Sequence, residues 1–285
     1  MVKQRGSAFG IKIVYLVYKV FGFWAMKLLL RFVAFYFALT TPKIKKDLSK
    51  IYTLCGKKYD FWEHFEHIYS FALVFTDRFL SKINSINYSF ELQNESIYTD
   101  NSEHPMMMFT AHLGDWHVCT RALPKTGQKM NVVMKEAVKK EVREFQNKIT
   151  NKEEYNTIDI SEGFFSYGVK IANALKNNEA VSIMIDRFNG AGKEVVFFGK
   201  KLLFHDTPFS LAYSQQAKMV AIFSFRVADF KYKIVFEEIH FDTSLSKEES
   251  IRQAMQEYAF LLEIYTKEYT KQWFNHYDIF EITTA

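Results

Sequence analysis

The chain has 285 residues, of which 48% are apolar and 24% charged, so it is long and apolar enough to bury a large core and is not a disordered chain. Its two cysteines, Cys55 and Cys119, lie far apart without metal-binding or redox spacing, and we expect free thiols in a reducing compartment. The sequence contains no P-loop and no H-E-x-x-H motif, and it therefore predicts no metal and no cofactor.

The positive charge of the chain is concentrated at its N-terminus. The formal net charge is +5, yet nine lysine and arginine residues precede the first acidic residue, Asp47. Subtracting these nine charges from the total leaves −4 for the rest of the chain. The pattern therefore indicates an N-terminal contact with an anionic membrane surface and no nucleic-acid groove.

Residues 8–39 contain no proline and only two glycines, Gly10 and Gly22, so they are predicted to form one long helix or two abutting helices. Five cations on or beside this segment fall in one sector of the helix, and the remaining arc is apolar. These cations are Arg5, Lys12, Lys19, Lys27 and Arg31. The segment is either an amphipathic helix at a membrane interface or a core helix with one solvated face. The absence of anions favours the membrane interface over a solvated core helix. The longest uncharged run, 32–42, is shorter than the roughly 20 residues of a span, so a tilted span with snorkelling lysines is the less favoured membrane alternative.

The rest of the chain has the pattern of an α/β domain. A helix is predicted at 57–80, and apolar or β-rich runs then alternate with helical patterns. The predicted strands are 106–109, 131–134, 157–160, 180–185, 194–198, 219–225 and 232–239, and the predicted helices are 135–149, 164–177, 208–216 and 247–271. This alternation predicts a mostly parallel central sheet flanked by helices, with ligands at the carboxyl ends of its strands. The simplest division is a membrane-associated helical segment, 1–46, followed by one α/β domain, 47–285.

A histidine directly follows the first predicted strand of this alternation. The run Phe109-Thr-Ala-His112-Leu-Gly114-Asp115-Trp-His117 carries it into a turn, after which the chain is predicted to become helical. A rigid strand that ends on a histidine is a common way to present a general base, since an unperturbed imidazole has a pKa of about 6.5. The alternative is a polar core histidine with its hydrogen bonds satisfied.

Further polar and turn residues follow in a fixed order. Asp186-Arg187 comes after the run 180–185 and is either part of a site or a structural ion pair. Phe198-Gly199 follows the next run, where the glycine is expected to serve a backbone turn. A Phe204-His205-Asp-Thr207-Pro turn opens a predicted helix, and the last motif is Gln272-Trp273-Phe274-Asn275, where Trp273 is expected to pack in the core or at an interface.

This ordered set of motifs resembles the lipid A biosynthesis acyltransferases, a family within the lysophospholipid acyltransferase-like superfamily. The Thr76-Asp77-Arg78 run is also similar to members found in aryl-polyene clusters. The resemblance covers nearly the whole chain. Two departures stand out: His117 stands where the family has an acidic residue five positions after its histidine, and His205 and Thr207 replace a proline and a glycine.

The resemblance implies transfer of a fatty acyl chain from an acyl carrier protein or coenzyme A thioester to a membrane lipid acceptor. It places the reaction at the cytoplasmic face of the inner membrane, with His112 as the general base. The residues implied in substrate binding are Gly114, Asp186, Arg187, Phe198 and Gly199. Asp115 is expected to orient the imidazole in place of the missing acid; the alternatives are a carboxylate elsewhere in the fold, or loss of activity.

Two rival functions remain open from the sequence. One is a non-catalytic lipid-binding or scaffold protein that keeps the same membrane helix and a relic cleft. The other is acyl transfer to a different acceptor such as glycerol phosphate. The Glu-Gly-Thr-Arg-like motif that would indicate this acceptor is absent from the sequence.

Overall fold

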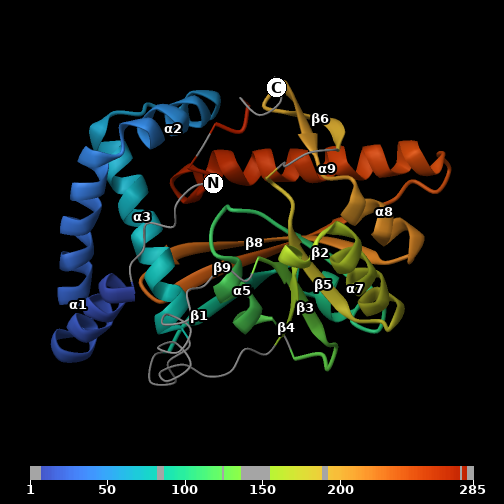
Figure 1. The fold of residues 1–285 in the computed structure, drawn as a ribbon, viewed down its shortest axis with the longest axis horizontal. Coiled ribbons are helices and arrows are strands. Elements are labelled where there is room, and N and C mark those ends of the chain that lie inside the picture. The colour runs from blue at the N-terminus through green and yellow to red at the C-terminus, as the bar shows by residue number, and fades with distance from the viewer. Residues whose placement is uncertain are drawn as a thin grey trace. The chain divides into compact units, whose positions relative to one another are not determined.

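The computed structural model describes residues 8–81, 87–123, 125–135, 155–187, 192–276 and 278–280 (Figure 1). The chain divides into two compact units. The first consists of residues 1–86 and 137–152, and the second of residues 87–136 and 153–285. The division therefore groups the N-terminal helix with all residues up to Ile86. The helix expected at 135–149 lies, apart from its first residue, outside the described residues.

The described part of the first unit is helical. Its elements are α1 (Ala8–Thr40), α2 (Pro42–Leu54) and α3 (Phe61–Leu80). Gly22 has a φ of 81° and a ψ of −175°, so α1 is two helices that meet at a kink, as one of the two interpretations predicted. Helix α2 was not predicted from the sequence; it has Pro42 in its first turn, where a missing N–H is tolerated. At the start of α3 the Asp60 carboxylate accepts hydrogen bonds from the N–H groups of Trp62 and Glu63.

Within this unit, α1 has one buried face and one exposed face. One face is buried and includes Met26, Leu30, Ala34 and Ala38. The other is exposed and apolar, with Trp24, Leu28, Phe32, Tyr36 and Leu39. Arg31 lies beside the buried face and forms an ion pair with Glu66 of α3. By length and composition α1 can also cross a membrane. The core-helix interpretation expects the exposed face to be basic and solvated, whereas the exposed face of α1 carries large apolar side chains.

The second unit is built on a seven-stranded sheet with the order β1-β9-β8-β2-β5-β3-β4. Its strands are β1 (Ser89–Gln93), β2 (Met106–Thr110), β3 (Met130–Met134), β4 (Asn156–Asp159), β5 (Ala180–Met184), β8 (Lys218–Ala228) and β9 (Lys231–Ile239). All neighbouring strands run parallel except β8 and β9. The mostly parallel sheet is therefore confirmed. The strands β1 and β7 were not predicted; β7 (Lys200–Phe204) pairs with β6 (Lys193–Phe197) in a separate hairpin.

Helices cover both faces of this sheet. They are α4 (Ser96–Thr99), α5 (Trp116–Ala122), α7 (Phe164–Lys176), α8 (Thr207–Ser214) and α9 (Lys247–Glu268), with short 3-10 turns η1 (Ile160–Glu162) and η2 (Thr270–Gln272). Met106 and Met108 of β2 belong to a core cluster with residues of α4 and α5. The alternate residue Phe109 stacks on Phe209 of α8 and contacts Tyr258 of α9, which runs along the sheet in Figure 1. Because both faces are covered, β2 is buried throughout.

Candidate active site

His112 and Asp186 lie at the carboxyl edge of the sheet, just beyond two neighbouring strands. β2 pairs in parallel with β5, from Met106 opposite Ala180 to Thr110 opposite Met184. The chain leaves both strands in the same direction, so residues two positions beyond each strand end meet at the same edge. The parallel pairing of these two buried strands therefore brings together residues 74 positions apart in the sequence.

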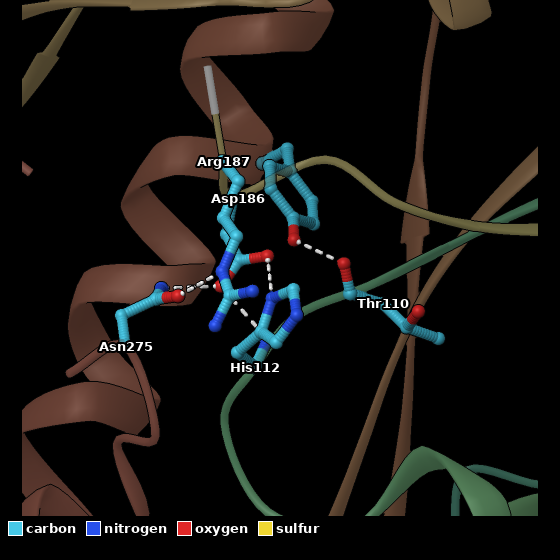
Figure 2. A network of polar contacts seen from close by, with 6 residues as sticks. Thr110, His112, Asp186, Arg187 and Asn275 are labelled. Atoms are coloured by element: carbon cyan, nitrogen blue, oxygen red, sulfur yellow. Dashed lines mark hydrogen bonds and ion pairs between the residues drawn. The ribbon is translucent and has the colours of Figure 1, made fainter. Parts of the chain in front are cut away.

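The Asp186 carboxylate makes three hydrogen bonds (Figure 2). Its Oδ1 lies 2.8 Å from Nδ1 of His112. Its Oδ2 accepts from the His112 backbone N–H at 2.7 Å and from Asn275 Nδ2 at 2.6 Å. The Asp186 side chain is fully buried, whereas 23% of the His112 side chain is exposed. The carboxylate thus fixes both the backbone and the ring of the histidine.

The electrostatics of this pair keep the carboxylate charged. Burial acts to raise the pKa of Asp186, but its attraction to His112, its hydrogen bonds from that residue and the charge of Arg187 outweigh burial and hold the pKa below its usual value. An ionised carboxylate only accepts hydrogen bonds, so Nδ1 of the ring carries the proton that faces it. Nε2 has no hydrogen-bond partner in the described part of the chain, and it is the nitrogen left to accept a proton.

The structure does not place Asp115 against this imidazole. Asp115 has an extended backbone, and its carboxylate accepts a hydrogen bond from the His117 N–H at 3.0 Å, which caps the start of α5. The expectation of an orienting Asp115 assumed that the helix begins directly after His112. It begins only at Trp116, so the Asp115 carboxylate faces the helix end, and Asp186 holds the ring instead. The His117 ring stacks on Trp116.

Gly114 allows the loop after His112 to lie close to β8. Its φ is +72°, and a Cβ at this position would lie 1.9 Å from the carbonyl oxygen of Ser224. Its N–H donates to the Gln272 carbonyl oxygen, and the next N–H, that of Asp115, donates to Ser224. That Gly114 binds substrate stays a prediction, but its backbone conformation and contacts already require glycine.

Replacement of Gly114 by alanine should destabilise the fold markedly. The left-handed conformation alone costs an L-residue about 1–2 kcal/mol, and the overlap with Ser224 adds to that cost. Gly199→Ala is the matched control, since Gly199 has a φ of +70° but a Cβ there would meet no neighbouring atom within 4 Å. Thermal unfolding should show a much larger decrease in Tm for Gly114→Ala than for Gly199→Ala. Equal decreases in Tm for the two variants would contradict the requirement for glycine where the backbone at 114 approaches Ser224.

Phe198 and Gly199 form the turn of the β6–β7 hairpin. Both have positive φ, 50° and 70°, which is the backbone that a tight hairpin turn requires. The Phe198 N–H donates to Glu263 of α9 at 2.6 Å. The expected turn role of Gly199 is confirmed, while the role of both residues in substrate binding remains a prediction. Trp273 is buried and stacks on Phe197, so its packing role is also confirmed.

Arg187 is exposed at the same edge and reaches Asp186 through Asn275. Its Nε donates to Asn275 Oδ1 at 2.7 Å, and the Asn275 amide donates in turn to Asp186. Asn275 belongs to the last sequence motif but had no predicted role, because nothing in its spacing relates it to His112, far earlier in the chain.

Among the described residues, no group of three or more His, Cys, Asp or Glu is arranged to hold a metal ion.

Comparison with known proteins identifies one family. The family model of bacterial lipid A biosynthesis acyltransferases matches residues 74–276 of this chain. The match covers more than half of the sequence and includes His112, Asp186, Arg187 and Asn275. No curated protein matches the sequence.

Proposed function

The chain belongs to the bacterial lipid A biosynthesis acyltransferase family, and from that premise we propose a specific reaction. It transfers a fatty acyl chain from the thioester of an acyl carrier protein or coenzyme A to a hydroxyl or amine of a membrane glycolipid. The observation that carries this proposal is the His112–Asp186 pair, in which a buried carboxylate orients a partly exposed imidazole. This arrangement suits a general base that works on a substrate at the edge of the sheet.

His112 moves one proton during the proposed transfer. The acceptor O–H or N–H is a poor nucleophile until a base removes its proton, and Nε2 takes that proton as the acceptor attacks the thioester carbonyl. The new ester or amide bond forms, the C–S bond breaks, and the imidazolium returns the proton to the leaving thiolate. The products are the acylated lipid and the free thiol of the carrier. Asp186 stabilises the imidazolium that exists between these steps.

Arg187 is the residue that we assign to phosphate recognition. Its exposed side chain lies beside His112 and Asp186 in Figure 2, and its Nε is held by Asn275. A guanidinium presents forked N–H donors that match the geometry of a phosphate. Phosphates occur on lipid A precursors and on the pantetheine arm of the acyl donor. Binding of either phosphate by Arg187 would bring the reacting group of that substrate close to His112.

The exposed apolar face of α1 supports association with the lipid that supplies the acceptor. Trp24, Leu28, Phe32, Tyr36 and Leu39 form this face, which we call the α1 stripe. Lysines on the same helix, including Lys12 and Lys19, are also exposed and suit anionic head groups. We assign the protein on this basis to the cytoplasmic face of the inner membrane, where acyl carrier proteins and coenzyme A thioesters are available.

Removing two aromatic residues of the α1 stripe should weaken membrane binding. Trp24→Ser combined with Phe32→Ser removes two side chains that are 76% and 67% exposed, and binding to vesicles should fall about tenfold or more. Phe165→Ser is the control, because Phe165 is 85% exposed on α7 in the other unit. Co-sedimentation with vesicles containing phosphatidylglycerol measures the effect, and raised salt should weaken binding of the unaltered chain. Equal binding of the double variant and the control would contradict the assignment of the α1 stripe.

Labelled acyl transfer tests the proposed reaction. The purified chain is incubated with vesicles of total lipid from a lipid A-producing bacterium and with a radiolabelled acyl group on either acyl carrier protein or coenzyme A. We expect label in the lipid fraction, with an equal amount of carrier thiol released. Vesicle binding without transfer from either donor would favour the rival function, a non-catalytic lipid-binding protein.

A further inference from the structure

The segment that follows η2 is attached to the His112 loop by its backbone. Leu113 and Trp273 form an antiparallel bridge, and the Phe274 N–H donates to the His112 carbonyl oxygen at 2.7 Å. The residue that follows Phe274 is therefore placed relative to His112 by main-chain contacts. That residue is Asn275, whose side chain is directed at the Asp186 carboxylate in Figure 2.

Asn275 is fully buried, and both ends of its amide group are used. Nδ2 donates to Asp186 Oδ2 at 2.6 Å, and Oδ1 accepts from Arg187 Nε at 2.7 Å. The direction of the amide follows from its neighbours, because a guanidinium only donates and an ionised carboxylate only accepts. The amide thus supplies a donor and an acceptor from two separate atoms without adding a charge to this buried site.

We propose that Asn275 is a positioning residue for the general base. It holds the Asp186 carboxylate in the orientation that fixes the His112 ring, and it shares the negative charge of that carboxylate through a hydrogen bond. It also connects Arg187 to the same carboxylate, so one amide sets the position of both groups. The catalytic consequence rests on the proposed function, whereas the effect on His112 itself does not.

Loss of the Asn275 amide should raise the proton affinity of the His112 ring. Without the hydrogen bond from Asn275, the negative charge of the Asp186 carboxylate interacts more strongly with its remaining partners. The imidazolium form of His112 is then held more strongly, so the ring keeps its proton to a higher pH. Among the described residues, Asp186 also interacts electrostatically with the Arg187 guanidinium and with Tyr258, whose burial raises its pKa well above the usual value and keeps it neutral.

The test combines a histidine titration with steady-state kinetics on the full chain. Asn275→Ala removes the amide, and Asn275→Leu removes it while conserving the side-chain volume. Asn131→Ala is the matched control, because Asn131 is also buried and donates to a carboxylate, that of Glu179 at 2.8 Å, but at the amino end of β3. Side-chain NMR of histidine-labelled protein follows His112, whose signal is identified by its loss in His112→Ala.

In both Asn275 variants the His112 titration should move to higher pH, and the acid limb of kcat/KM should move with it. The turnover kcat should fall about 10- to 100-fold with little change in the donor KM, since a hydrogen bond to a charged group is lost. The control should match the unaltered protein in both measurements. An unchanged His112 titration in folded variants would overturn the proposal, as would loss of folding in both. If the unaltered chain transfers no acyl group while the titration still moves, positioning by Asn275 stands and the proposed function fails.

Discussion

Replacement of His112 by alanine should reduce acyl transfer by about 10²- to 10⁴-fold, the usual contribution of a general base. The side chain is partly exposed and its ring contacts Asp186 through Nδ1, so its removal leaves the packing of β2 unchanged but leaves the buried carboxylate without its partner. Label transferred to lipid, measured at saturating donor, gives the decrease in turnover.

Circular dichroism and thermal unfolding serve as controls for the His112→Ala protein, because a buried carboxylate without its partner lowers stability. A folded His112→Ala protein with turnover close to that of the unaltered chain would exclude His112 as the base. His117→Ala provides a second comparison, since His117 stacks on Trp116 and lies outside the contacts of the Asp186 carboxylate.

Replacement of Asp186 by asparagine should lower turnover by about 10²- to 10⁴-fold, while the same change at Asp115 should have little effect. Asparagine at 186 cannot stabilise an imidazolium, and its amide group can hold the ring in the wrong tautomer. Asparagine at 115 is still a good helix cap and can accept the His117 N–H. Steady-state kinetics of both variants measure the difference, and a larger loss in Asp115→Asn would contradict the assignment of Asp186.

The parallel sheet could be predicted because its central strands are largely buried on both faces. The run 106–109 is continuously apolar, the run 180–185 is apolar apart from Ser182, and the structure has β2 and β5 there. β1 was missed because it is a half-exposed strand whose polar residues alternate with apolar ones over only five residues. Its place in the sheet comes from pairing with β9, which lies about 140 residues later and has no local signal.

The site could be predicted only in part from the sequence. His112 and Asp186 are recognisable because each follows a strand, and neighbouring parallel strands end at the same edge. Which carboxylate faces the ring depends on where α5 begins, and one turn of helix decides whether Asp115 lies near the ring or caps the helix. Asn275 could not be assigned, because its contact with Asp186 depends on how the segment after η2 pairs with the His112 loop.

Acylation of a membrane lipid by means of His112 is the central claim. The most direct measurement is mass spectrometry of lipids extracted from cells that produce the unaltered chain, the His112→Ala variant at equal protein level, or neither. We expect a lipid heavier by one acyl chain in cells with the unaltered chain, and its absence from the other two. Identical lipid profiles in all three, or the same acylated lipid in cells with His112→Ala, would contradict the claim.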